Sequence, residues 1–119
     1  MKRLLVITDS PRTEATVHFA LSLLGVPHDV VRSLAEAVAR LDRESYRATL
    51  VDLHWGRSAA ASLSSWTHAH LVARDLRVIL TACTPLWWDM RCCAPLPAAT
   101  YLRRNFDLLD LKEAVVGAA

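Results

Sequence analysis

The sequence predicts an α/β protein in which a five-stranded parallel sheet is covered by helices on both faces. Aliphatic runs bounded by small polar residues recur along the chain, and such runs are typical of strands buried on both sides. Segments with apolar residues at helical spacing separate these runs. Because strands that alternate with helices build a parallel sheet, we expect three layers, doubly wound, with the strand order 2-1-3-4-5.

Five segments are the predicted strands. The first and third, 3–7 and 47–51, are the most apolar, and each runs directly into small polar or acidic residues. The second, 27–31, is short. The fourth, 77–80, runs into a threonine, and the fifth, 100–104, ends in two arginines.

Two helices have clear start signals. Ser10 is a predicted N-cap with Pro11 at the first helical position, where its missing N–H costs nothing, and this helix stops at Gly25. Ser33 and Glu36 form a Ser-x-x-Glu capping box that opens the second helix.

The second half of the chain predicts three further helices. One covers 63–71, and a second is limited to about two turns between Pro85 and Ala94 because prolines interrupt it. The last begins with Asp107 as N-cap and ends at Gly117.

Chemistry-bearing side chains follow the predicted strands where those strands end. Asp9 follows the first strand, Asp52 the third and Thr81 the fourth, while Arg104 closes the fifth. Ligands of open α/β sheets collect beyond the carboxyl ends of the strands. We therefore expect an acidic pocket with one hydroxyl donor and one fixed cation at this edge.

With these residues in place, the chain resembles a bacterial response-regulator receiver domain of the CheY-like, flavodoxin-like type over nearly its whole length. The resemblance implies that Asp52 is the candidate phosphoryl acceptor and that Asp9 and Asp52 hold Mg²⁺, with the backbone carbonyl of His54 as a weaker ligand. It also implies that Thr81 supplies the hydroxyl of the site and that Tyr101 is the aromatic switch residue.

The resemblance is incomplete in chemistry. Thr8 stands where receivers carry the first acid of an acidic pair, Arg104 where they carry a lysine, Asn105 where they carry a proline, and Gly56 at another position that is normally proline. Arginine keeps the positive charge but presents a planar fork suited to pairing with a carboxylate. We expect weak or absent Mg²⁺ binding.

Three functions are compatible with this pattern. The first is an atypical receiver, a non-enzymatic signalling module in which phosphorylation of Asp52 is weak, altered or absent and at most autocatalytic. The alternative is a conventional Mg²⁺-dependent receiver that a histidine kinase phosphorylates on Asp52. A third, a flavodoxin-like binding domain or small enzyme, lacks support because no Gly-rich phosphate loop follows the first strand.

Length, composition and charge limit the number of domains, the kinds of partner and the location that we expect. At 119 residues and 53% hydrophobic, the chain is expected to form one domain, 1–119. A net charge of +2 with scattered arginines argues against a nucleic-acid partner. The apolar runs are too short for a membrane span or a secretory signal, so we expect a cytoplasmic protein.

Cysteines and histidines give no metal motif by spacing. Cys83 stands apart from the adjacent Cys92 and Cys93, so no Cys-x-x-Cys pair exists, and we expect buried thiols. His68 and His70 lie two positions apart, which puts them on different faces of a helix.

A partner surface is expected beside the fifth strand. Trp87 and Trp88 fall in the shortened fourth helix, which the resemblance to receivers places beside Tyr101. Tryptophan and tyrosine are among the residues that dominate binding hot spots. We expect a signalling protein partner, a histidine kinase or an effector domain, or a second copy bound through the fourth helix, fifth strand and last helix.

Overall fold

Five parallel strands form the centre of the molecule. The computed structural model describes residues 3–52, 69–71, 76–82, 99–103 and 106–117. The strand order is β2-β1-β3-β4-β5, which confirms the predicted topology. The strands are β1 (Arg3–Thr8), β2 (His28–Val31), β3 (Tyr46–Asp52), β4 (Arg77–Ala82) and β5 (Ala99–Arg103).

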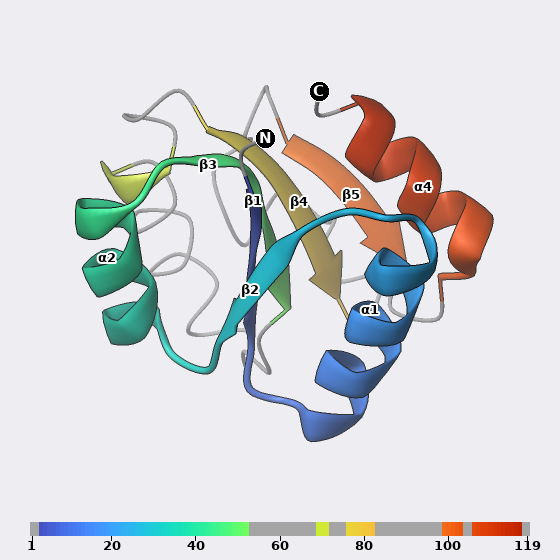
Figure 1. Ribbon diagram of the computed structural model, residues 1–119, viewed down its shortest axis with the longest axis horizontal. Helices are drawn as coiled ribbons and strands as arrows, with labels where there is room; N and C mark the ends of the chain where they lie inside the picture. The colour runs from blue at the N-terminus through green and yellow to red at the C-terminus, as the bar shows by residue number, and fades with distance from the viewer. Residues whose placement is uncertain (1–2, 53–68, 72–75, 83–98, 104–105, 118–119) are drawn as a thin grey trace, which may run out of the picture.

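Helices cover both faces of this sheet (Figure 1). Helices α1 (Pro11–Leu23) and α4 (Leu108–Gly117) lie on one face, and α2 (Leu34–Arg43) lies on the other. The three-layer α/β class is therefore confirmed. Within the described ranges, no helix has the length and apolar character that a membrane span requires.

The start of α1 follows the predicted signals. The Ser10 hydroxyl accepts a hydrogen bond from the Thr13 N–H at 3.3 Å, and Pro11 occupies the first helical position. The helix ends at Leu23, and Gly25 then turns the chain with a φ of +70°, a conformation that glycine adopts without steric cost. This turn leads directly into β2.

The capping box of α2 is confirmed in one half and differs in the other. The Ser33 hydroxyl accepts from the Glu36 N–H at 3.1 Å, as predicted. The Glu36 carboxylate, however, accepts from the N–H of Arg32 at 3.1 Å, one residue before the N-cap. The last helix has a reciprocal box instead, in which Asp107 and Asp110 each accept a hydrogen bond from the other's N–H.

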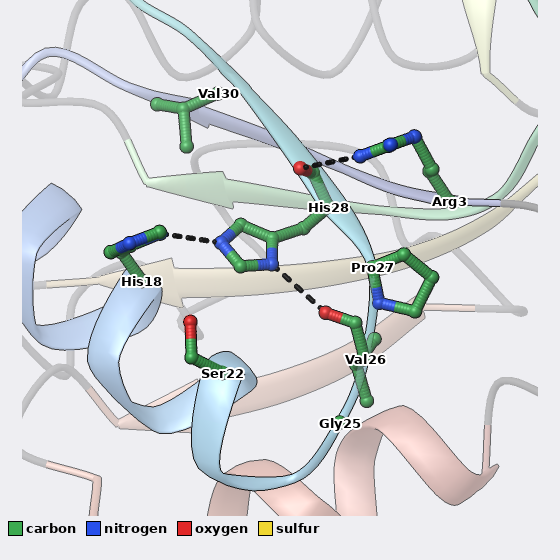
Figure 2. A pocket seen from close by; sticks show the side chains of 8 residues that line it. All are labelled: Arg3, His18, Ser22, Gly25, Val26, Pro27, His28 and Val30. Carbon is green, nitrogen blue, oxygen red and sulfur yellow. Dashed lines mark hydrogen bonds between the residues drawn. The ribbon is translucent and has the colours of Figure 1, made fainter.

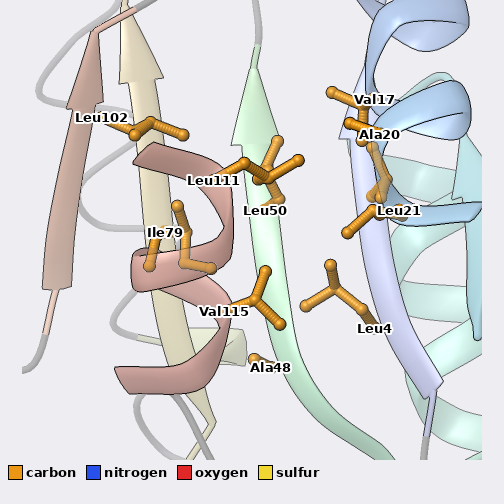
Figure 3. Packing of buried hydrophobic residues seen from close by; sticks show 12 residues of the cluster. Leu4, Val17, Ala20, Leu21, Ala48, Leu50, Ile79, Leu102, Leu111 and Val115 are labelled. Atoms are coloured by element: carbon orange, nitrogen blue, oxygen red, sulfur yellow. The ribbon is translucent and has the colours of Figure 1, made fainter. Parts of the chain in front are cut away.

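Alternation along the strands divides the core into two clusters. Leu4 of β1 and Ala48 and Leu50 of β3 lie in one cluster under α1 and α4, together with Leu21 and Leu111 of those helices (Figure 3). Odd-numbered residues such as Leu5 and Val51 pack on the α2 face with Ala37. This period of two is what a sheet buried on both sides requires.

Two sequence expectations lie largely beyond the described residues. Of the predicted helix over 63–71, only residues 69–71 are described, and Leu71 is fully buried there. The predicted short helix between Pro85 and Ala94 lies outside the described residues.

Candidate functional site

Asp52 is the last residue of β3 and is completely buried, with 0% of its surface exposed. The hydroxyl of Thr8, at the end of β1, donates a hydrogen bond of 3.0 Å to its Oδ2 atom. Thr8 is itself only 1% exposed, and its Oγ1 accepts a 3.2 Å hydrogen bond from the Ser10 N–H. Two consecutive hydrogen bonds therefore connect the start of α1 to the carboxylate.

Register and side-chain alternation bring these two residues together. Thr8 is the partner of Asp52 where β1 and β3 pair, so the two side chains leave the sheet side by side. Side chains alternate between the two faces of a sheet, so Thr8 lies on the same face as Leu4 and Asp52 on the same face as Leu50. That face packs under α1 and α4. The pair therefore lies at the carboxyl end of the sheet, beyond the last apolar residues of that cluster.

The electrostatics of the pair follow from its burial. A hydrogen bond to a carboxylate is stronger than one between neutral groups, and a buried carboxylate without such donors is costly. An acid in place of Thr8 would set a second negative charge beside Asp52, and one of the two would then need a proton or a cation. The threonine donates a hydrogen bond to the carboxylate and adds no charge.

The other predicted site residues fall into two groups. Asp9 directly follows Thr8 and is exposed. Thr81 in β4 is one residue beyond Leu80, which pairs with Val51, and Tyr101 in β5 pairs with Leu80. The backbone thus places Thr81 on the strand next to that of Asp52 and Tyr101 one strand further away. Four predicted residues lie outside the described residues: His54, Trp87, Trp88 and Arg104.

The described residues offer a limited donor set for a metal. Asp9 and Asp52 are two carboxylates near one sheet edge, and Mg²⁺ is often held by one or two carboxylates together with waters. Within the described ranges no group of three histidine, cysteine, aspartate or glutamate side chains is assembled for a metal. The two carboxylates therefore fit a Mg²⁺ site in which waters supply the other ligands, and the Asp52 Oδ2 atom accepts the Thr8 hydroxyl as well.

Thr8 is the residue whose role the sequence did not reveal. The resemblance identifies position 8 only as a missing acid, whereas the structure gives the hydroxyl a specific bond to Asp52. The role of Thr8 follows from its position opposite a buried acid on the neighbouring strand. The pairing of the two strands sets that position, and the sequence alone does not show it.

Comparison with known proteins gives matches in structure alone. No family model and no curated protein matches the sequence. A sensor protein from Polaromonas sp. JS666 matches with a TM-score of 0.72 and 25% identity over 99% of this chain and 98% of that one. The receiver domain of a sensor histidine kinase from Pseudomonas aeruginosa matches with a TM-score of 0.72 and 23% identity, over 94% and 92%.

The chemotaxis protein CheY4 of Vibrio cholerae matches over 100% of this chain and 99% of its own, with a TM-score of 0.74 at 13% identity. In fold, the chain is a CheY-like receiver domain. The strand order and the carboxylate that ends β3 agree with this assignment of the receiver fold. The Pseudomonas receiver domain is described with a magnesium ion coordinated in its active-site cleft.

Proposed function

We propose that this receiver-fold chain is a signalling module of one domain, 1–119, that acts by binding another protein and in which phosphorylation of Asp52 is weak or absent. The observation that carries the proposal is the 3.0 Å hydrogen bond from the Thr8 hydroxyl to Asp52 Oδ2, with both residues buried. It supports a resting state in which the carboxylate is stabilised by the protein itself.

The chemistry of acceptance explains why this bond matters. Phosphoryl transfer to Asp52 would form a bond between a carboxylate oxygen and phosphorus, and the leaving group would depart with the electron pair of the broken bond. A carboxylate that accepts a charge-assisted hydrogen bond holds its lone pairs more tightly and is a poorer nucleophile. Since Asp52 has no exposed surface, a donor must also displace its surroundings to reach it.

Magnesium would contribute charge neutralisation of the transferring phosphoryl group when bound. Asp9 and Asp52 are the residues that would hold it, together with waters and, from the sequence resemblance, the backbone carbonyl of His54. The missing third acid at Thr8 lowers the negative charge available, so we propose that affinity for Mg²⁺ is weak.

A conventional receiver is the second candidate. It is favoured by the two carboxylates that the chain retains at positions 9 and 52, by Thr81 on the strand next to that of Asp52 and by Tyr101 on the strand after it. In this alternative a histidine kinase phosphorylates Asp52, and Arg104 replaces the usual lysine as the cation that neutralises the product.

The proposed partner is a signalling protein, either a histidine kinase or an effector domain, and the proposed setting is the cytoplasm. The surface proposed for binding is the one predicted from Trp87, Trp88 and Tyr101, which a second copy of the chain would also use. In this role the domain carries no enzymatic activity beyond transfer to its own Asp52.

Acetyl phosphate separates the two candidates. We expect the unaltered protein with millimolar Mg²⁺ to gain no phosphoryl mass on Asp52, while a Thr8→Asp, Arg104→Lys double variant gains it. We also expect Mg²⁺ to raise the melting temperature of Thr8→Asp alone, because two adjacent carboxylates bind the cation in the folded state only. Stoichiometric phosphorylation of the unaltered chain that Asp52→Asn abolishes would establish the conventional receiver instead.

A further inference from the structure

Two histidines face each other at the edge of the sheet. Both are distant in sequence from Asp52, the candidate phosphoryl acceptor. His18 lies on α1 and His28 begins β2, and the Nδ1 atom of His18 is 2.8 Å from the Nε2 atom of His28 (Figure 2). The ring centroids are 5.0 Å apart and the ring planes meet at 62°. The turn at Gly25 brings these residues together.

A contact with the backbone selects one tautomer of the neutral His28 ring. Its Nδ1 atom lies 2.9 Å from the carbonyl oxygen of Val26, and a carbonyl can only accept a hydrogen bond. The Nδ1–H therefore donates to Val26, which leaves the lone pair of Nε2 directed at His18. This is the arrangement found in metal-ligating histidines, whose second nitrogen donates to a backbone carbonyl that fixes the tautomer.

We propose that His18 and His28 form a binding site for a divalent transition metal ion, with Cu²⁺ the ion it binds most tightly. Imidazole nitrogen is a preferred ligand of copper, nickel and zinc, and Cu²⁺ is bound most strongly among the divalent ions of this series. When the metal takes the Nδ1 atom of a neutral His18, the proton of that ring resides on Nε2. The exposed position of His18 leaves that atom to solvent.

The two nitrogens are close enough to bind one metal ion together. Nitrogens about 2.0–2.1 Å from a metal lie about 2.9 Å apart at a right angle and about 3.3 Å apart at the tetrahedral angle. In the metal-free chain the 2.8 Å separation is that of a hydrogen bond between the two rings, and a small movement apart would give the right angle that occurs in tetragonal sites of Cu²⁺ and Ni²⁺. A rotation of the exposed His18 ring directs both lone pairs to one ion.

The surroundings leave room for the rest of the coordination sphere. The pair borders an open pocket of about 520 Å³ that Ser22 and Arg3 also line. The Arg3 guanidinium is engaged by Asp29 and by the His28 carbonyl oxygen, each at 3.3 Å, so its charge is partly compensated. On the other side of His18, Glu14 pairs with Arg32 at 3.0 Å.

Water would complete the site. Among the described residues no third histidine, cysteine or acidic side chain joins the pair, so two protein ligands hold the ion and its affinity is modest. The site is also separate from Asp52. His28 pairs with Leu4 near the start of β1, whereas Asp52 pairs with Thr8 at the end of that strand.

Copper binding to the tag-free protein tests the proposal. We expect one Cu²⁺ per chain by calorimetry, in the micromolar range, and an electron paramagnetic resonance spectrum with splitting from two imidazole nitrogens. His18→Gln and His28→Gln should each weaken binding at least tenfold and remove one nitrogen from the spectrum. Circular dichroism should show both variants folded.

Substitutions at a histidine and an acid outside the pair serve as controls. His70→Gln and Asp52→Asn should leave copper affinity and spectrum unchanged. Retention of the two-nitrogen spectrum in the His18→Gln, His28→Gln double variant would overturn the assignment, because the copper would then lie elsewhere. Absence of binding to the unaltered protein at micromolar copper would overturn the site itself.

Discussion

The buried carboxylate of this receiver fold accepts a hydrogen bond from the hydroxyl group of Thr8. Thr8 donates to Asp52 and accepts from the Ser10 N–H, so its single proton and one lone pair are both used. A serine or threonine hydroxyl does this without adding charge, whereas an acid at the same position creates a demand for a cation. A threonine at position 8 therefore lowers the negative charge beside Asp52 compared with an acid.

Removing that hydroxyl should destabilise the fold. Because Thr8→Val leaves a buried carboxylate with one donor fewer, we expect a loss of about 1.5–3 kcal/mol in the free energy of unfolding. Urea denaturation at neutral pH measures it. The matched control is Thr49→Val, since Thr49 is equally buried but donates to the neutral Arg77 carbonyl, and about 0.5–1.5 kcal/mol is expected there. Equal losses in the two variants would mean that the charge of Asp52 contributes nothing.

Another buried residue with a hydroxyl group is Tyr46, whose Oη atom is 2.8 Å from Glu44 Oε2 and 2.9 Å from Asp29 Oδ2. Burial, followed by the hydrogen bonds to Glu44 and Asp29, raises the pKa of Tyr46 well above its ordinary value. The folded chain therefore keeps this proton at a pH where the unfolded chain releases it. Its contribution to stability is complete below the ordinary tyrosine pKa of about 10 and is lost as pH rises beyond it.

Comparison with Tyr46→Phe isolates this effect. We expect the free energy of unfolding of the unaltered chain to fall more steeply than that of Tyr46→Phe above about pH 10. Chemical denaturation at several pH values from neutral to alkaline measures the free energy of unfolding of both chains. In the difference between them, the contributions of the titrating groups that both chains share cancel. Parallel curves would show that Tyr46 ionises alike in the folded and unfolded chains.

At the scale of elements, local signals predicted most of the secondary structure. Ser10, Ser33 and Asp107 were predicted N-caps, and all three accept hydrogen bonds from the first turn of their helices. Helix caps and hydrophobic periodicity depend only on residues close together in the chain, so they can be predicted from the sequence. The bond from Arg32 to Glu36 was not predicted, because its geometry depends on how the chain leaves β2.

The cap of α1 can be tested separately from the carboxylate it adjoins. Ser10→Ala removes the acceptor for the Thr13 N–H but keeps the backbone N–H that binds Thr8, so we expect a loss of about 1 kcal/mol in stability. Thermal and urea unfolding measure this loss. Ser22→Ala, an exposed serine within the same helix, serves as the control and should change stability by less than about 0.5 kcal/mol. A cost equal to that of the control would show that the cap is not made in solution.

At the scale of the whole molecule, alternation predicted the sheet and its order, but contacts between distant segments were not accessible. Asp52 was correctly placed at the end of β3, yet its bond to Thr8 joins residues 44 positions apart. The same limit applies to His18 and His28, which were not singled out because only the turn after α1 and the pairing of β2 with β1 bring them together. Sequence patterns identify which residues end strands, whereas register decides which of them meet.

The central claim is that Asp52 is held by Thr8 and does not respond to a phosphoryl group. Beryllofluoride, a phosphoryl mimic, tests this most directly when its binding is followed by fluorine NMR with Mg²⁺ at millimolar concentration. We expect no bound fluoride signal for the unaltered chain and a bound signal for the Thr8→Asp, Arg104→Lys double variant, with Asp52→Asn added as the control that removes it. A bound signal in the unaltered chain that Asp52→Asn abolishes would contradict the claim and establish a conventional receiver.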